Sequence, residues 1–205
     1  MFLQLIHNVA LLVALSVGLQ LLARRLVRNQ LLYRVAAGAL FGFAGVIGMM
    51  TPMHFAPGII YDGRSIVLSL AGLFGGPIAA AIAAAACGTY RLLLGGPGTL
   101  PGVLAVVEAA ALGVGLYYLR RRDESWVKAG WLLAFGVLVH VGMLGLQLLL
   151  PEGQGWTVLR EVGPVVLVFF PLGFLLIAMV FLQGERQRAT EQALRESEAL
   201  QRAMI

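Results

Sequence analysis

Apolar segments of membrane-spanning length fill nearly the whole sequence from Phe2 to Leu182. A spanning helix needs about 20 largely apolar residues. Five segments clearly meet this requirement: 2–22, 35–52, 102–119, 129–150 and 163–182. The composition agrees, since only 12% of the residues are charged, against about 25% in a soluble domain. We therefore predict an all-α polytopic membrane protein.

Arginines gather at the ends of these segments and predict how the chain is oriented. The first connection holds Arg24, Arg25, Arg28 and Arg34, and a later one holds Arg120, Arg121, Arg122 and Lys128. Cytoplasmic connections carry an excess of Lys and Arg. We therefore expect both to face the cytoplasm, with the N-terminus outside, the C-terminus inside, and the protein in the inner (cytoplasmic) membrane. The net charge of +5 is then explained by topology and contact with membrane lipids, and no nucleic acid partner is expected.

The region 58–94 contains the apolar run YDGRSIVLSLAGLFGGP, which is interrupted after about half the length of a spanning helix. With the orientation above, this region begins and ends outside, so it must enter the membrane and return. Gly75 and Gly76 permit a tight reversal, and Pro77 suits the first residue of a new helix. We predict a broken helical hairpin with its hinge at these three residues, which gives six to seven helices in all. The alternatives are two short spans, or a single crossing that would place the N-terminus inside.

Four ionisable residues are not explained as topology signals: Asp62, Arg64, Arg91 and Glu108. At a rise of about 1.5 Å per residue, the hairpin returns Arg64 and Arg91 to similar depths, roughly 17 Å and 21 Å from its turn. Ionisable residues within a bilayer normally face the protein interior or a water-filled cavity. Two guanidiniums match a small carboxylate or another anion. We predict that all four residues converge on a ligand site in the outer half of the domain.

Hydroxyl groups lie beside this cluster in the sequence. Tyr61 and Tyr90 can donate hydrogen bonds to a ligand, and Ser65 and Thr89 are similarly placed. The predicted ligand-binding set is Arg64, Arg91, Asp62, Tyr90, Glu108 and Tyr61. The alternative is a buried ion-pair network that only fixes helix packing. For Asp62 alone that alternative is preferred, since a carboxylate two residues before Arg64 can hold the start of a helix.

Catalytic and metal sites are not expected. Cys87 is the only cysteine, which excludes a thiolate metal cluster, and it fits a small core residue among alanines. His7 and His140 lie on separate apolar segments, without acidic or thiol partners at metal-ligand spacing. No nucleophile, base and orienting acid can be assembled from the sequence. We predict that this chain is not an enzyme and binds no cofactor.

The residues after Leu182 change character and are rich in Glu, Arg and Gln. Four of them are spaced by four, three and four positions, as in the seam of a two-stranded coiled coil: Ala193, Ser197, Leu200 and Met204. We therefore divide the chain into a transmembrane sensor domain, 1–182, and a cytoplasmic linker, 183–205. The linker is expected to lead to an output domain and to join two copies as a homodimer. A frayed amphipathic tail is the alternative.

The order of the motifs resembles that of a known family. An Arg-rich first connection is followed by IIYDGRSIVLSLAGLFGGPIAAAIAAAACGTYRLLLGGPG and then by RRRDESW. This order is similar to the five-transmembrane receptor domain of LytS-type sensor proteins, in which D-x-R and an apolar run precede A-G-L-x-G-G-P, a small-residue helix, and Y-R or F-R shortly before G-G. The matching positions are Asp62, Arg64, Ala71, Gly72, Leu73, Gly75, Gly76, Pro77, Tyr90, Arg91, Gly95 and Gly96. The resemblance covers about 1–182.

The resemblance implies a sensory input module, normally fused to a cytoplasmic histidine kinase, diguanylate cyclase or PAS domain. The resemblance also implies that, as in some family members, the two hairpin arginines respond to small carboxylates; these correspond to Arg64 and Arg91. The family is also distantly similar to the S components of energy-coupling-factor vitamin transporters, so the alternative function is a solute-binding transporter subunit. A purely structural module or a sensor of membrane state is a third interpretation. The linker favours the sensor, because a transporter subunit should have short cytoplasmic ends.

Overall fold

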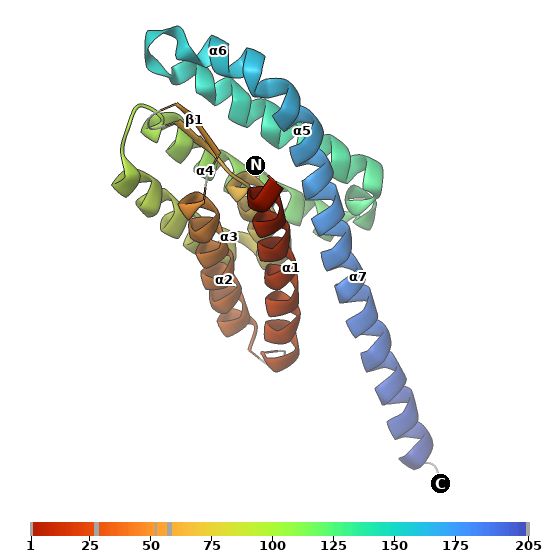
Figure 1. Cartoon of the computed structure of the whole chain (residues 1–205). Coiled ribbons are helices and arrows are strands. Elements are labelled where there is room, and N and C mark those ends of the chain that lie inside the picture. The colour runs from red at the N-terminus through yellow and green to blue at the C-terminus, as the bar shows by residue number, and fades with distance from the viewer. Residues whose placement is uncertain (1, 27–28, 52, 57–58, 204–205) are drawn as a thin grey trace.

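The computed structural model describes the backbone of residues 2–26, 29–51, 53–56 and 59–203. It describes the side chains of residues 11, 13–26, 29–51, 60–195 and 197–202. Seven α-helices make up most of this part (Figure 1): α1 (Phe2–Arg25), α2 (Gln30–Met50), α3 (Arg64–Leu94), α4 (Thr99–Arg122), α5 (Ala129–Leu146), α6 (Gln154–Glu161) and α7 (Gly163–Ala203). Short 3-10 turns occupy Glu124–Val127, Gln147–Leu149 and Pro151–Gly153. The predicted all-α architecture is confirmed.

A short β-hairpin, which the sequence did not predict, precedes α3. Strand β1 (Met53–Ala56) pairs antiparallel with β2 (Ile59–Tyr61), and Met53 is the partner of Tyr61 in the register. Strands of four and three residues are too short to show a clear alternation of apolar and polar positions. The hairpin matters for the site because it delivers Tyr61 and Asp62 to the start of α3.

Five helical stretches among the described residues are long and apolar enough to cross a membrane: α2, α3, α4, α5 with the turn that follows it, and α7. This finding agrees with the predicted polytopic membrane protein. Four of the stretches correspond to predicted spans, and α1 covers the predicted span 2–22. The remaining stretch, α3, is the region predicted as a hairpin.

Helix α3 is broken at the predicted hinge. Gly76 has φ 73° and ψ −168°, a left-handed conformation that glycine adopts without steric cost, and Pro77 begins the second arm. A straight helix would separate Arg64 from Arg91 by about 40 Å, yet both residues line one cavity. The two arms of α3 therefore fold back on each other. The first arm measures about 18 Å and does not reach across a hydrocarbon core of about 30 Å.

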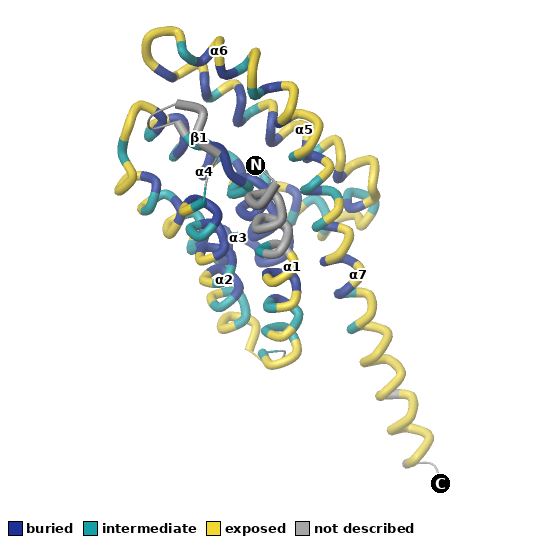
Figure 2. Tube along the Cα trace, viewed as in Figure 1, coloured by how far each residue is buried: buried dark blue, intermediate teal, exposed yellow. Residues whose placement is uncertain are grey.

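The first arm of α3 is the centre of the bundle. Every residue from Ser65 to Gly76 is buried, and the helix packs against α2, α4, α5 and α7. A helix that is apolar all round belongs in an interior position, and Figure 2 shows this burial along α3. Its contact with α4 is close, because an added Cβ on Gly72 would lie 2.5 Å from the backbone of Gly113. The rest of the fold is arranged around this arm.

The second arm of α3 packs on α2 through small residues. An added Cβ on Gly38 would lie 2.9 Å from the Cα atom of Ala79, and one on Gly45 would lie 2.5 Å from the sulfur of Cys87. Small residues let helices approach closely within a membrane. The alanine run 79–87 therefore serves close packing, as predicted, and Cys87 is a fully buried core residue.

The Arg-rich ends of α1 and α4 meet α7 beyond its apolar part. Arg120 forms an ion pair with Glu185 of α7, and Arg24 Nη2 lies 3.6 Å from Glu191 Oε2, also on α7. The two connections predicted to share one side of the membrane therefore lie at one end of the bundle, where α7 leaves it.

Helix α7 runs without a break from Gly163 to Ala203 and extends well past the bundle (Figure 1). It contains Pro171, which packs closely on α5, since an added Cβ on Gly136 would lie 3.0 Å from the Cα atom of Pro171. Three residues of the predicted coiled-coil seam are exposed: Ala193, Ser197 and Leu200. The fourth, Met204, lies outside the described residues, as does the side chain of His7.

Candidate functional site

A polar cavity lies where both ends of α3 meet the start of α4 and the end of α5. It is lined by Ile60, Tyr61, Asp62, Arg64, Ser65, Arg91, Gly98, Gly102, Ala105, Met143 and Gln147. Its volume is about 20 Å³, which is enough for roughly one water molecule. The cavity is therefore lined in part by charged groups, and it encloses very little space.

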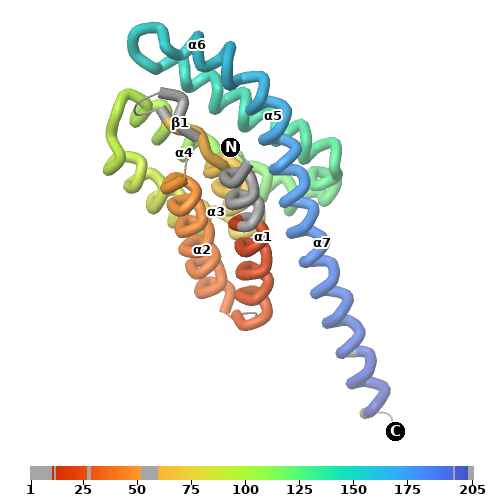
Figure 3. Tube along the Cα trace, viewed as in Figure 1, coloured from red at the N-terminus to blue at the C-terminus, as the bar shows by residue number. Residues whose placement is uncertain are grey.

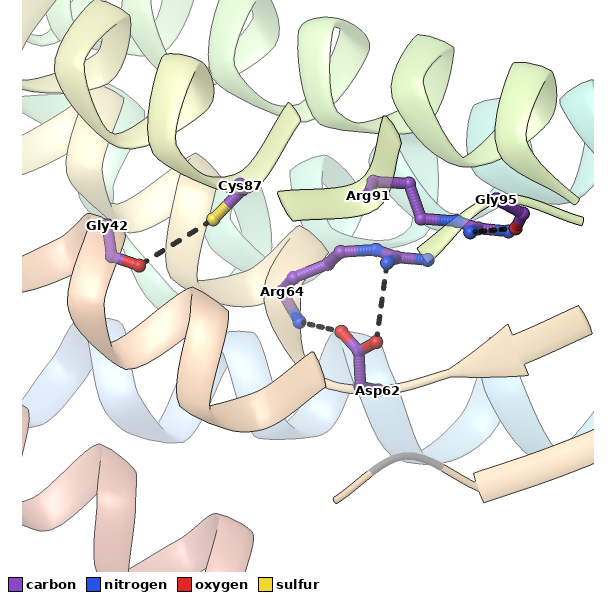
Figure 4. A network of polar contacts seen from close by, with 6 residues as sticks. All are labelled: Gly42, Asp62, Arg64, Cys87, Arg91 and Gly95. Carbon is purple, nitrogen blue, oxygen red and sulfur yellow. Dashed lines mark hydrogen bonds and ion pairs between the residues drawn. The ribbon is translucent and has the colours of Figure 1, made fainter. Parts of the chain in front are cut away.

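Asp62 holds the start of α3 and pairs with its first side chain (Figure 4). Its Oδ1 accepts a hydrogen bond of 2.9 Å from the backbone N–H of Arg64, and its Oδ2 lies 3.5 Å from Arg64 Nη1. The side chain of Asp62 is fully buried, and that of Arg64 is 11% exposed. The interpretation that Asp62 holds the incoming helix agrees with this geometry, and the same carboxylate also compensates Arg64.

Arg91 reaches the cavity from the far end of the second arm. The residue is 1% exposed, and its Nη1 donates a hydrogen bond of 2.8 Å to the Gly95 carbonyl oxygen. Its side chain passes over Gly102 of α4, where an added Cβ would lie 2.6 Å from Arg91 Nε. Figure 4 shows the two guanidiniums next to each other. The charged residues of the lining are thus two arginines and one aspartate, which leaves an excess of positive charge.

Tyr61 adds a hydroxyl group to the same cavity. The residue is 6% exposed, and its hydroxyl oxygen has no hydrogen-bond partner among the described residues. Burial raises the pKa of the Tyr61 phenol above its ordinary value, because desolvation disfavours the phenolate. Tyr61 is therefore a neutral group that can donate a hydrogen bond into the cavity.

Two predicted site residues do not line the cavity. Glu108 lies on another face of α4 from Gly102 and contacts Gly142 of α5, and both of its carboxylate oxygens lack a hydrogen-bond partner in the described part of the chain. Tyr90 is half-buried and packs against the apolar core. Glu108 therefore does not join Asp62 and the two arginines in the lining of this cavity, because helix rise predicts depth but not the direction in which a side chain points.

A buried histidine that was not predicted as a site residue lies next to the cavity. His140 of α5 is fully buried, with Nδ1 2.7 Å from the Gly136 carbonyl oxygen and Nε2 3.1 Å from Ser65 Oγ. A carbonyl only accepts, so Nδ1 carries the proton and Nε2 accepts from the Ser65 hydroxyl. Ser65 and His140 are far apart in the sequence, and no local pattern connects them.

Gln147 and Gly102 were also not predicted as lining residues. Gln147 lies just after α5, and its Nε2 donates a hydrogen bond of 3.2 Å to the Met143 carbonyl oxygen. A glycine inside an apolar helix is a general signal of close approach, but the sequence does not say that Arg91 is the group that approaches Gly102. In the part of the chain that the structure describes, no three His, Cys, Asp or Glu side chains are grouped to hold a metal ion.

Comparison with known proteins gives a match to a family. A family model described as 5TMR of 5TMR-LYT matches residues 19–183, which is more than half of the chain. No curated protein and no solved structure matches. The matched range contains the whole arginine cavity, the hinge and the apolar part of α7.

Proposed function

The chain belongs to the 5TMR-LYT family, whose domain is a membrane sensory domain of signalling receptors, and we propose that its arginine cavity binds a small anion from the outer face of the membrane. The observation that carries this proposal is the meeting of Arg64 and Arg91, from opposite ends of α3, in one cavity with a single aspartate. A guanidinium pairs with a carboxylate through two parallel hydrogen bonds. A small carboxylate is therefore the preferred ligand class, with Tyr61 as an additional donor.

The size of the cavity sets a condition on binding. A space of about 20 Å³ holds roughly one water molecule, so a carboxylate enters only if the elements around the cavity move apart. A ligand shifts a conformational equilibrium only as far as its affinities for the two states differ. Binding and movement of the α3 ends are therefore one event in this proposal, and that coupling is what a receptor requires.

Two sets of contacts connect α3 with α7. Near the hinge, the rings of Phe74 and Phe181 meet edge to face with centroids 5.0 Å apart. The guanidinium carbon of Arg120 lies 5.6 Å from the centroid of Phe74, and Arg120 also pairs with Glu185 of α7. These contacts support a path by which movement of the first arm displaces the output helix.

The second set of contacts starts in the lining of the cavity. Ser65 donates to His140, and the ring of His140 meets Phe170 of α7 edge to face with centroids 5.3 Å apart. In our proposal, displacement of Ser65 by a ligand changes the packing of His140 on α7. The output helix is thus reached both from the hinge and from the cavity itself.

Helix α7 delivers the signal to the cytoplasm in this proposal. Its exposed part continues past the bundle, which supports a paired helix in a homodimer and an attached output domain of the histidine kinase or diguanylate cyclase type. The end of the bundle that α7 leaves carries the Arg-rich ends of α1 and α4. By the rule that positive residues face the cytoplasm, this end is cytoplasmic in the inner membrane, and the cavity opens outside.

The proposal is tested by thermal stability of the purified chain in detergent with a panel of small carboxylates, nucleobases and vitamins. A ligand at 100 times its Kd stabilises the folded state by about 2.7 kcal/mol, which is roughly 5–10 °C for a chain of this size. We expect one anion class to raise the melting temperature, and the effect to vanish in Arg64→Ala and Arg91→Ala. The matched control is Arg160→Ala, an exposed arginine on α6, which should keep the full response.

Other outcomes point to the alternative functions. Stabilisation by a neutral vitamin that survives both substitutions would favour the solute-binding transporter subunit. If no compound changes the melting temperature and both variants are only less stable, the arginines are structural, and the domain senses the membrane itself or a partner protein.

A further inference from the structure

A second hollow lies on the outside of the bundle, in the groove between α1 and α2. It is lined by Gly18, Leu21, Leu22, Arg25, Leu26, Ala36, Leu40 and Phe43. Its volume is about 590 Å³, far larger than that of the arginine cavity. Figure 3 shows α1 and α2 side by side, joined at the end where Arg25 lies.

Small residues create this groove and large apolar ones form its walls. An added Cβ on Gly18 would lie 3.0 Å from a methyl carbon of Leu40, so a larger residue at position 18 would begin to fill the space. Leu21 is 55% exposed and Phe43 is 65% exposed. The lining extends from Gly18 to Arg25 of α1, about 10 Å along the helix. The groove thus has the apolar character and the volume of a site for an acyl chain.

The end of the groove carries an uncompensated positive charge. Arg25 is exposed, and none of the ion pairs among the described residues involves it. Its neighbour Arg24 already pairs with Glu191 of α7. Asp62 is the first acidic residue in the sequence, so neither α1 nor α2 offers Arg25 a carboxylate.

We propose that this groove binds one anionic phospholipid of the phosphatidylglycerol type. Its acyl chain packs along the Leu and Phe side chains, and its phosphate pairs with Arg25 at the headgroup level. Basic pockets between transmembrane helices on the cytoplasmic side bind anionic headgroups, and a guanidinium suits phosphate oxygens. A second copy is a poorer occupant, because symmetric pairing through α1 and α2 would bring no acidic residue against Arg25. This site does not depend on the anion receptor proposed above.

Native mass spectrometry of the full chain tests the site with two lipids of identical acyl chains, phosphatidylglycerol and phosphatidylcholine. Both lipids carry a phosphate, but the quaternary ammonium of phosphatidylcholine cancels its charge and is repelled by Arg25. We therefore expect phosphatidylglycerol to bind about tenfold more tightly. Arg25→Gln should remove this preference, and Ala36→Leu, which fills the groove, should weaken both lipids. The control is Arg122→Gln, an exposed arginine at the end of α4, which should leave the preference intact.

Three results would overturn the proposal. Equal affinity for both lipids would show that the charge of Arg25 selects nothing. An equal loss in Arg25→Gln and Arg122→Gln would show that diffuse surface charge attracts the lipid. Unchanged affinities in a folded Ala36→Leu variant would show that the lipid does not occupy the groove. Arg25→Gln alters one exposed side chain, so it decides the test even if Ala36→Leu does not fold.

Discussion

The two ends of the bundle use the same kinds of charged residue in opposite environments. At the cavity end, the side chain of Asp62 is fully buried and Arg91 is 1% exposed. At the end where α7 leaves, the side chains of Arg24 and Glu191 are 58% and 51% exposed. Removing one partner of a buried pair costs several kcal/mol, whereas an exposed pair contributes about 0–1 kcal/mol. The buried charges therefore have a large effect on stability whenever one partner is lost. The exposed charges affect stability little, which suits residues that only orient the chain in the membrane.

The largest expected effect is that of Asp62→Ala. This change leaves Arg64 without its carboxylate in a nearly closed cavity, so we expect a loss of about 3–5 kcal/mol in the free energy of unfolding. Thermal melting in detergent without added anions measures it. Glu124→Ala removes an exposed carboxylate at the other end and should change stability by less than about 0.5 kcal/mol. If both changes lowered stability equally, the contrast between buried charges at the cavity end and exposed charges at the other end would be wrong.

Gly102→Ala should have the next largest effect. The added methyl group would lie against Arg91 Nε and Cδ, and overpacking of this kind costs roughly 1–3 kcal/mol. The matched control is Gly115→Ala on the same helix, where an added Cβ meets nothing within 4 Å, so helix propensity alone should raise stability by up to about 1 kcal/mol. A stable Gly102→Ala variant would show that Arg91 moves freely.

Glu108→Leu is expected to change stability in the opposite direction, because it should stabilise the protein. Both oxygens of Glu108 are buried without a hydrogen-bond partner among the described residues, and replacing an unsatisfied polar group by an apolar one removes a desolvation cost. We expect the free energy of unfolding to increase by roughly 1 kcal/mol, which raises the melting temperature. Glu161→Leu, an exposed glutamate on α6, is the control. A marked fall in Glu108→Leu would indicate that Glu108 has a partner, such as a ligand.

The smallest effect is expected for Glu191→Gln, which breaks the exposed pair with Arg24. Because both side chains are more than half exposed, we expect a change of less than about 0.5 kcal/mol, smaller still at high salt. A double-mutant cycle of Arg24→Gln with Glu191→Gln measures the coupling. The less exposed pair of Arg120 and Glu185 should give a larger coupling energy, and the reverse order would contradict the argument from burial.

Much of the fold follows from signals that are local in the sequence. Segment length and the Gly75, Gly76 and Pro77 break predict the spans and the hinge. The helix rise then predicts that Arg64 and Arg91 reach the same depth. Each of these inferences needs only distance along one element, and the structure agrees with them.

The features of the cavity that the sequence did not predict depend on the direction of a side chain or on contacts between distant elements. Glu108 lies on another face of α4 from Gly102, and Tyr90 packs against the core, so neither residue lines the cavity. Ser65 and His140 meet because α5 packs beside α3. No periodicity in either helix specifies that contact. Prediction of the cavity was therefore better for its charges than for its neutral lining.

The proline within α7 gives that helix the mechanical properties of a lever. Pro171 removes a backbone hydrogen bond and makes its turn easier to bend, and it rests on Gly136, whose carbonyl oxygen is also the partner of His140. From Pro171 to Ala203 the helix measures about 48 Å, so a tilt of roughly 5° at this fulcrum moves the far end by about 4 Å. A small displacement near Pro171 is thereby amplified into a much larger one at the exposed end of α7.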